Sequence, residues 1–264
     1  MNLLINEVFY SIQGEGYSAG FPTVFVRLQG CNLACSWCDT KYAQSEKDNK
    51  KYMQIDVDTL FSTICSYINH SHICITGGEP LLQNDALILL LDKIERCKEV
   101  QDVVIQTNGS LDIRPFLLPK VIIAMDYKLE SSGFMDKMLH ENLIALREKD
   151  EIKFVVADRN DFELSLDLQN KYSMHSKIVY SPVFPLMQYD DLANMILKSN
   201  IHCKYSLQLH KHIWPDIEYD CVLLGKHTAK RILCFGGGQP TSAVSVVLIS
   251  MYSAIRRNSS ANLK

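Results

Sequence analysis

The sequence predicts an α/β fold built on parallel strands. Short β-branched or apolar runs, typical of buried strands, alternate with segments whose apolar residues recur every three or four positions, as in amphipathic helices. This alternation indicates parallel β/α units with right-handed crossovers. The chain has 264 residues, 47% hydrophobic and 22% charged, which suits one large globular domain. Periodicity alone leaves open a complete barrel, a partial barrel and an open doubly wound sheet.

The expected strands, in chain order, are residues 23–28, 72–76, 102–107, 121–126, 151–156, 177–181 and 205–209. The expected helices between them are residues 57–70, 85–97, 137–147, 161–170 and 190–200. The first helix shows the periodicity well, because Val57, Leu60 and Ile64 fall on one face.

Unusual residues follow four consecutive strands of the predicted sheet. A loop with Cys31, Cys35 and Cys38 follows the first strand, and Gly77-Gly78-Glu79-Pro80 follows the second. Asn108-Gly109 follows the third strand, and Asp126-Tyr127-Lys128 ends the fourth. Because the carboxyl ends of parallel strands meet at one edge, these segments predict a single functional edge.

The cysteine loop has the spacing C-x3-C-x2-C, formed by Cys31, Cys35 and Cys38. A [4Fe–4S] cluster usually takes four cysteines, and a structural zinc takes four N or S ligands. Three thiolates therefore indicate a cluster with one iron left open for a substrate or cofactor. The alternative is a zinc site completed by a distant residue such as Cys65 or His72.

The Gly-Gly-Glu-Pro segment suits a ligand that approaches the backbone closely. Glycines permit that approach, and Glu79 can accept a hydrogen bond from an amine, although the segment alone could be a turn. Together with the cysteine loop one β/α unit upstream, it resembles the radical S-adenosylmethionine (SAM) superfamily. The resemblance implies a partial (β/α)6-type barrel with parallel strands, a [4Fe–4S] cluster on the three cysteines, and SAM bound to the fourth iron.

Further segments narrow the resemblance to 7-carboxy-7-deazaguanine synthases. Residues 9–16, 25–27 and 38–42 carry it, and it extends through 75–82, 107–109, 125–128, 153–158, 181–184 and 207–211. It covers residues 1 to about 215. The family is expected to convert 6-carboxy-5,6,7,8-tetrahydropterin to 7-carboxy-7-deazaguanine with loss of ammonia, a lyase step of deazapurine (queuosine-type) biosynthesis. The tRNA modification pathway is one user of this product, and the sequence leaves the downstream pathway open.

The resemblance also implies the ligand contacts, with no catalytic side chain beyond the radical that the cofactor carries. The pterin is expected to contact Ile12, Gln13, Gly14, Arg27 and Thr76. SAM is expected to contact Trp37, Cys38, Asp39, Gly78, Glu79, Asp126, Tyr127, Lys128, Ser181, Pro182 and Val183. Arg27 suits a carboxylate held by two parallel hydrogen bonds, and Thr40 is the expected ligand of Mg²⁺, which prefers oxygen.

Two other functions share parts of this pattern. A glycyl-radical-enzyme activase has the same cysteines and Gly-Gly-Glu-Pro, but its substrate is a protein, so Gln13 and Arg27 would have no purpose. A non-catalytic Fe–S binding or electron-transfer protein would need four cysteines per cluster. Gln106 departs from the family, since many relatives carry an acidic residue there; an amide can accept a hydrogen bond but cannot pair with a cation.

Composition and termini suggest partners and location. The start of the chain lacks a basic signal-peptide region, and nine irregularly spaced cysteines do not form a disulfide framework, so the cytoplasm is expected. The family implies a homodimer, an electron donor such as flavodoxin or ferredoxin, and no direct contact with nucleic acid.

Residues 1–219 are the expected core domain, and residues 220–264 a basic extension of unknown role. Its apolar run, residues 243–255, is too short to span a bilayer, and membrane contact by this tail stays open.

Overall fold

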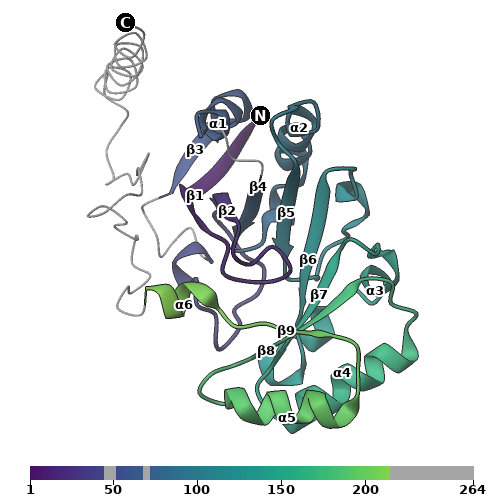
Figure 1. Ribbon diagram of the computed structural model, residues 1–264. Coiled ribbons are helices and arrows are strands. Elements are labelled where there is room, and N and C mark those ends of the chain that lie inside the picture. Colours follow the sequence, from purple (N-terminus) through teal and green to yellow (C-terminus); the bar gives the residue numbers. More distant parts are fainter. Residues whose placement is uncertain (45–51, 68–71, 215–264) are drawn as a thin grey trace, which may run out of the picture. The chain divides into compact units, whose positions relative to one another are not determined.

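A nine-stranded sheet forms the centre of the fold (Figure 1). The computed structural model describes residues 1–44, 52–67 and 72–214. The strand order is β3-β1-β2-β4-β5-β6-β7-β8-β9. The strands are β1 (Asn2–Ile12), β2 (Pro22–Leu28), β3 (Met53–Asp56), β4 (His72–Gly77), β5 (Asp102–Thr107), β6 (Val121–Tyr127), β7 (Glu151–Val156), β8 (Lys177–Pro182) and β9 (Lys204–Tyr205).

The strands from β2 onward, with β3 left out, are parallel. This confirms the predicted α/β class with parallel strands. The strands lie close to their predicted positions, except that β9 has two residues, Lys204 and Tyr205, and the predicted run to Leu209 ends in helix α6 (Leu209–Ile213).

Two antiparallel strands, β1 and β3, lie at one edge and were not predicted. The β1–β2 ladder contains a register shift between Ile5 and Glu7, so the buried positions of β1 change phase from Leu3 and Ile5 to Val8. Strand β1 therefore lacks the clean alternation that marks a half-buried strand. Its residues from Glu7 onward line the functional site described below.

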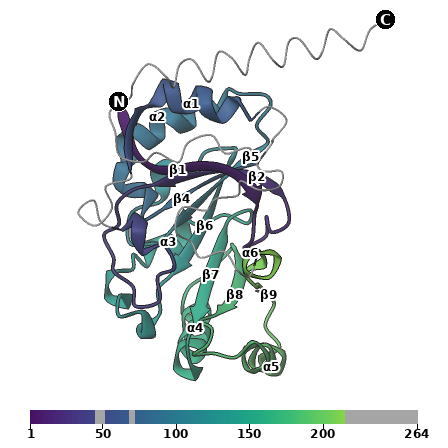
Figure 2. The ribbon, with the colours of Figure 1, turned by 90° about the vertical axis from the view of Figure 1, so that its left-hand side faces the viewer.

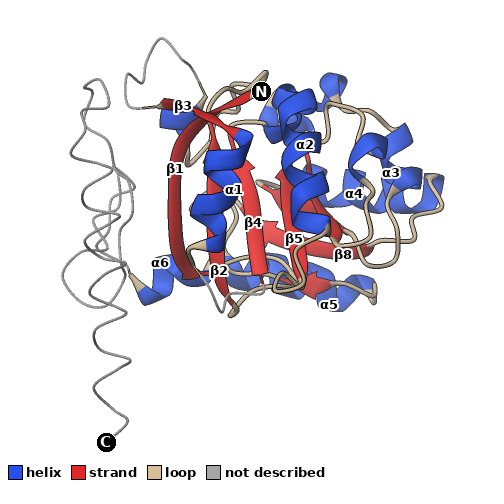
Figure 3. Cartoon of the chain, turned by 90° about the horizontal axis from the view of Figure 1, so that it is seen from above, coloured by secondary structure: helices blue, strands red, loops and turns tan. Residues whose placement is uncertain are grey.

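Helices α1 (Val57–Cys65) and α2 (Asn84–Glu95) pack against each other and lie over β2, β4 and β5 (Figure 3). Their apolar faces hold fully buried Leu60, Leu87 and Leu90, each of which stabilises the fold by about 1.5–3 kcal/mol. Asp56 caps α1, since its carboxylate accepts from the backbone N–H of Thr59 at 3.0 Å.

Helices α4 (Arg159–Lys171) and α5 (Tyr189–Ser199) lie beside β7 and β8, away from α1 and α2 (Figure 2). Helix α3 (Glu141–Ala145) is shorter than predicted, because Met135–Lys137 forms a separate 3₁₀ turn. No helix within the described part of the chain is both long and apolar enough to cross a membrane. The proposed boundary at residue 219 and the apolar run at 243–255 lie outside the described residues.

Candidate active site

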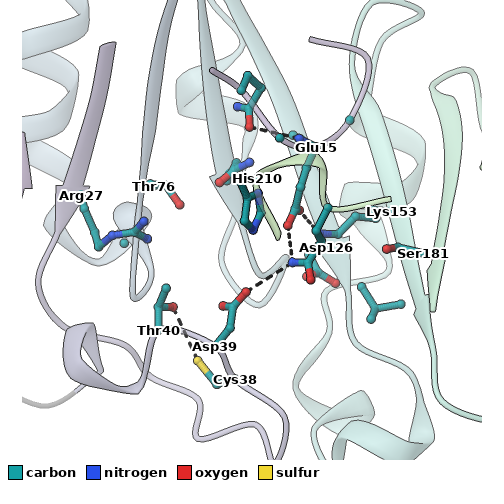
Figure 4. Close-up of a pocket in the computed structure, with 18 of the residues that line it drawn as sticks. Glu15, Arg27, Cys38, Asp39, Thr40, Thr76, Asp126, Lys153, Ser181 and His210 are labelled. Atoms are coloured by element: carbon teal, nitrogen blue, oxygen red, sulfur yellow. Dashed lines mark hydrogen bonds and ion pairs between the residues drawn. The ribbon is translucent and has the colours of Figure 1, made fainter. Parts of the chain in front are cut away.

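A cavity of about 430 Å³ lies at the carboxyl ends of the parallel strands. All of the predicted site residues line it except Glu79 and Tyr127. The predicted residues in the lining are Ile12, Gln13, Gly14, Arg27, Cys31, Cys35, Trp37, Cys38, Asp39, Thr40, Thr76, Gly78, Asp126, Lys128, Ser181, Pro182 and Val183. Figure 4 shows Arg27, Thr76 and Thr40 on one side of the cavity and Asp126, Lys153 and Ser181 on the other. The structure therefore brings together segments that are far apart in the sequence.

Backbone hydrogen bonds hold the cysteine loop in place. The Gly30 N–H donates to the Ala43 carbonyl at 2.8 Å, and the Cys31 N–H donates to the Gln44 carbonyl at 2.9 Å. The Cys38 N–H donates to the Cys35 carbonyl at 3.2 Å, which turns the chain between these two ligands. All three thiols consequently line the same cavity.

Two of the three thiols lie in surroundings that favour their neutral form. Burial raises the pKa of Cys31 and of Cys35, so the thiolate form needs a nearby cation such as iron. Within the described ranges, no group of three or more His, Cys, Asp or Glu side chains could hold one metal ion. A cluster does not require such convergence, because each cysteine binds a different iron.

The zinc alternative does not fit the structure. His72 begins β4 and pairs with Asp102 at 2.9 Å, whereas the cysteine loop follows the carboxyl end of the parallel strand β2. His72 is thus at the opposite end of the sheet from the cysteines. Cys65 ends helix α1, and neither residue is part of the cavity lining.

Glycines allow the end of β4 to pack directly on the cysteine loop. The Gly78 N–H donates to the Leu28 carbonyl at 3.2 Å, and the Glu79 N–H donates to the Gly30 carbonyl at 2.7 Å. A Cβ atom on Gly78 would lie 2.1 Å from the Gly30 carbonyl oxygen. Glycine is therefore required at position 78 for steric reasons, and this contact fixes the cysteine loop against the second strand.

The Glu79 side chain is fully buried and is directed into the protein. Its carboxylate accepts hydrogen bonds from the Asn108 N–H at 2.6 Å, the Thr107 hydroxyl at 2.8 Å and the Leu81 N–H at 3.0 Å. Burial raises the pKa of Glu79, and these hydrogen bonds oppose the rise. Glu79 thus ties the end of β4 to the end of β5, and its contact with a SAM amine stays a prediction.

Tyr127 is the second predicted residue outside the cavity lining. Its side chain is buried, and its hydroxyl lies 2.9 Å from His140 Nδ1. Successive side chains of a strand point to opposite faces, so Asp126 and Lys128 face the cavity while Tyr127 faces away. The Tyr127 side chain is therefore outside the cavity lining, and a contact between Tyr127 and SAM stays a prediction.

Arg27 presents a cation to the cavity from β2. Its Nε donates to Glu7 Oε1 at 2.7 Å, and the Tyr42 hydroxyl donates to the same oxygen at 3.3 Å. Burial would lower the pKa of Arg27, but Tyr42 and Glu7 outweigh it and keep the guanidinium charged. Its two terminal nitrogens have no hydrogen-bond or ion-pair partner among the described residues, which leaves one edge of the guanidinium for an anion.

A network of charged residues crosses the cavity from loop 13–16 to β6. Glu15 pairs with Lys153 at 2.7 Å, and Lys153 lies 3.7 Å from Asp126. Asp126 also pairs with Lys128 at 3.0 Å. Gln208 reaches the same network, since its side-chain amide donates to Glu15 at 2.5 Å. These residues come from four separate segments, so only the fold joins them.

Comparisons with known proteins agree with this geometry. Residues 12–114 match the family described as "4Fe-4S single cluster domain". The 7-carboxy-7-deazaguanine synthase of Thermoplasma acidophilum is 35% identical over 216 residues, covering 81% of this chain and 99% of the relative. The chain belongs to the 7-carboxy-7-deazaguanine synthase family. The family member of Clostridium acetobutylicum is 36% identical over 222 residues, covering 81% of this chain and 97% of that protein.

A solved structure supports the same family. The crystal structure of QueE from Escherichia coli has a TM-score of 0.63 at 27% identity, and covers 79% of this chain and 94% of that chain. The chain therefore belongs to a family of enzymes that use a [4Fe–4S] cluster and radical SAM chemistry.

Several cavity residues of this 7-carboxy-7-deazaguanine synthase family member were not predicted as site residues. They are Glu7, Glu15, Tyr42, Gln106, Lys153, Gln208 and His210. The segments 153–158 and 207–211 did carry the family resemblance, so Lys153 and Gln208 could have been found there. Tyr42 likewise falls within the family-like segment 38–42. Glu7 gave no signal, because an isolated glutamate is typical of any surface.

The Glu15–Lys153 pair predicts an acid-sensitive part of the stability. Burial would raise the pKa of Glu15, but Lys153 outweighs it and lowers the pKa from 4.5 to about 2. A lowered carboxyl pKa stabilises the fold above pH 4.5, and this contribution is lost as the pH falls toward 2. We expect Glu15→Gln to reduce the free energy of unfolding at pH 7 by on the order of 2–3 kcal/mol.

Urea unfolding at pH 7, at about pH 4.5 and at about pH 3 measures this effect under anaerobic conditions. The difference between wild type and Glu15→Gln is expected to shrink as the pH falls. A difference that stays constant over this range would show that the Glu15 charge contributes nothing to stability.

Proposed function

We propose that this chain converts 6-carboxy-5,6,7,8-tetrahydropterin to 7-carboxy-7-deazaguanine with loss of ammonia. The observation that carries the proposal is that Cys31, Cys35 and Cys38 share one cavity with Arg27, a partly buried cation whose two terminal nitrogens have no hydrogen-bond partner among the described residues. A redox-active cluster site and a carboxylate site therefore lie side by side. The relatives are named after the product that they make, and the geometry supports an acidic small-molecule substrate.

Cys31, Cys35 and Cys38 would hold the cluster, with SAM beside them. Hydrogen-atom abstraction from carbon is the chemistry that a bound cluster and SAM supply. We propose that Trp37, Asp39 and the backbone at Gly78 contact SAM from the cluster side. Across the cavity, one carboxylate oxygen of Asp126 is buried and has no hydrogen-bond partner within the described chain, which supports a contact with a SAM hydroxyl or amine. Ser181, Pro182 and Val183 would complete this side.

Residues of the chain itself would orient the pterin and exclude water. Arg27 would hold the substrate carboxylate, while Gln13 and the backbone of Ile12 and Gly14 would pair with the pterin edge. The Gln106 amide also lines the cavity, and it can donate as well as accept where a carboxylate would only accept. Thr76 on β4 lies beside Arg27 and would close this side of the substrate.

We propose that Mg²⁺ binds at Thr40, with remaining ligands from the substrate and from water. The Thr40 hydroxyl lines the cavity and lies 3.6 Å from the Cys38 sulfur. Magnesium usually keeps several waters and takes few protein ligands. A magnesium site with a single protein ligand is consistent with the described residues, which do not form a group of three or more carboxylate, cysteine or histidine ligands.

The family supports this function over the two alternatives. A glycyl-radical-enzyme activase acts on a protein, and Arg27, Gln13 and Glu15 would have no role beside a polypeptide backbone. A non-catalytic Fe–S protein would need a fourth cysteine, and Cys65, Cys74, Cys97 and Cys203 are not among the cavity-lining residues. The alternatives are therefore not favoured.

Several further proposals rest on the family or on the composition of the chain. They are a homodimer, a cytoplasmic location, a flavodoxin or ferredoxin as electron donor, a product used in tRNA modification, and no direct contact with nucleic acid. The same holds for a core domain of residues 1–219 followed by a basic extension of unknown role. Gel filtration would test the homodimer, and reduction assays with purified flavodoxin or ferredoxin would test the electron donor.

Replacing Arg27 with lysine tests the substrate site. We expect Arg27→Lys to weaken pterin binding by about one to two powers of ten, because a charge-assisted hydrogen bond is worth roughly 1.5–3 kcal/mol. Lysine keeps the charge beside Glu7 but loses the planar pair of donors. Pterin affinity is measured by calorimetry on anaerobic, cluster-loaded protein, with SAM affinity as the control that stays unchanged. Equal pterin affinity in both proteins would place Arg27 outside the substrate site.

A further inference from the structure

Glu15 links two groups of site residues that come from separate parts of the chain. Its carboxylate accepts from Lys153 at 2.7 Å and from the Gln208 amide at 2.5 Å. Lys153 also lies 3.7 Å from Asp126, and Gln208 also donates to Asp39 at 3.4 Å. One carboxylate is thus connected to two aspartates, through one side chain each (Figure 4).

The two ends of this network belong to different ligands of the proposed function. Glu15 directly follows Gln13 and Gly14, the proposed pterin contacts. Asp39 and Asp126 are proposed SAM contacts, on the cysteine loop and on β6 respectively. Glu15 therefore stands between the substrate half of the cavity and the SAM half.

The network is charged and poorly exposed, so its members depend on one another. The side chains of Glu15 and Lys153 are 17% and 21% exposed. Lys153 keeps Glu15 ionised, and in turn Glu15 and Asp126 raise the pKa of Lys153 against its burial. Partly buried charges are weakly screened, and each is costly to leave unpaired. A ligand that binds Asp39 or Asp126 will consequently change how firmly Lys153 and Gln208 hold Glu15.

We infer that Glu15 is a positioning residue that makes the binding of the pterin and of SAM mutually dependent. SAM on Asp39 and Asp126 would direct Lys153 and Gln208 toward Glu15, and Glu15 would then fix the adjacent Gln13 and Gly14 for the pterin. Such coupling is reciprocal, so the pterin must tighten SAM binding by the same factor. This inference rests on the proposed function, because it needs both ligands in one cavity.

Binding measurements without reductant test the coupling, because no turnover then occurs. The full chain, loaded anaerobically with its cluster, is titrated with 6-carboxytetrahydropterin in the absence and presence of saturating SAM. In the wild type we expect SAM to tighten pterin binding by at least about fivefold, the low end of typical couplings. In Glu15→Gln we expect the ratio of the two dissociation constants to fall close to one.

A second variant, Gln208→Met, removes the connection to Asp39 without changing any charge. It is expected to fold normally and to show a ratio between those of the wild type and Glu15→Gln. SAM titrations with and without the pterin must return the same ratios as the pterin titrations. Thermal unfolding of each loaded protein confirms that the variants are folded at the titration temperature.

Glu151→Gln is the matched control. Glu151 lines the same cavity as Glu15 and is buried. It also anchors the same loop, because its carboxylate accepts from the Tyr17 N–H at 3.0 Å. No hydrogen bond joins Glu151 to Asp39 or Asp126 within the described residues. Glu151→Gln is therefore expected to keep the wild-type ratio, even where loosening of the loop lowers the pterin affinity itself.

Three results would overturn the inference while the proposed function stands: pterin binding to the wild type that SAM does not change, a wild-type ratio in Glu15→Gln, or an equal loss of the ratio in Glu15→Gln and Glu151→Gln. The last result would show that loop anchoring alone is responsible. Absence of pterin binding to the wild type under both conditions would instead refute the proposed function, and the inference with it.

Discussion

Replacing any one of Cys31, Cys35 and Cys38 with alanine is expected to abolish SAM cleavage and to release most of the bound iron. All three thiols line one cavity, and no other cysteine of the described residues lines it. Two thiolates hold too few irons to retain a [4Fe–4S] cluster. The measurements are iron and sulfide content after anaerobic reconstitution, with about four irons per chain in the wild type, and 5′-deoxyadenosine formed from SAM under reduction.

Cys65→Ala and Cys74→Ala are the matched controls. Cys65 ends helix α1, and Cys74 is fully buried within β4. Both variants are expected to keep their iron and to cleave SAM. Loss of the cluster in Cys65→Ala would refute the assignment of three cysteines to an open site.

Gly78→Ala is expected to have the second largest effect, because the added methyl group would clash with backbone atoms. The new Cβ would lie 2.1 Å from the Gly30 carbonyl oxygen and 2.7 Å from the Ala43 carbonyl oxygen. Neither atom can move without displacing the cysteine loop. We expect a loss of unfolding free energy of about 3 kcal/mol or more, together with cluster occupancy well below that of the wild type.

Gly133→Ala serves as the control for this substitution. Gly133 has a left-handed φ of 78°, but a Cβ there meets no atom within 4 Å. Its cost is therefore about 1 kcal/mol of backbone strain, without effect on the cluster. Chemical unfolding and iron analysis of both variants decide the matter. Normal iron content in Gly78→Ala would mean that this contact does not position the cysteine loop.

The parallel part of the fold could be predicted because its strands are short runs rich in β-branched and apolar residues, separated by helical patterns. Strands β5 and β7 have the predicted bounds, since each is a short apolar run between turn residues. Strand β1 was missed because the register shift after Ile5 breaks its alternation and its later residues face a cavity instead of a core. Strand β3 has four residues with an alternating half-buried pattern, which is too little signal to recognise.

The candidate site was predictable where its chemistry is local in sequence. The spacing of the three cysteines and the Gly-Gly-Glu-Pro segment needed no fold to be recognised. In contrast, Glu15 meets Lys153 across 138 positions and Gln208 across 193. Each of these residues alone is typical of a solvated surface, so only the fold shows that they act together. The sequence could not show that the Glu79 carboxylate is hydrogen-bonded to Leu81, Thr107 and Asn108, because a sequence shows an acceptor but not its donors.

The most direct test of the account is the identity of the product formed from 6-carboxy-5,6,7,8-tetrahydropterin. The full chain, loaded with its cluster, is incubated anaerobically with SAM, Mg²⁺, reductant and the pterin, and the products are identified by mass spectrometry. The account predicts 7-carboxy-7-deazaguanine, released ammonia and pterin-dependent 5′-deoxyadenosine. An unchanged pterin would contradict it: SAM cleavage that requires a protein substrate would indicate an activase, and no SAM cleavage under any condition would indicate a non-catalytic Fe–S protein.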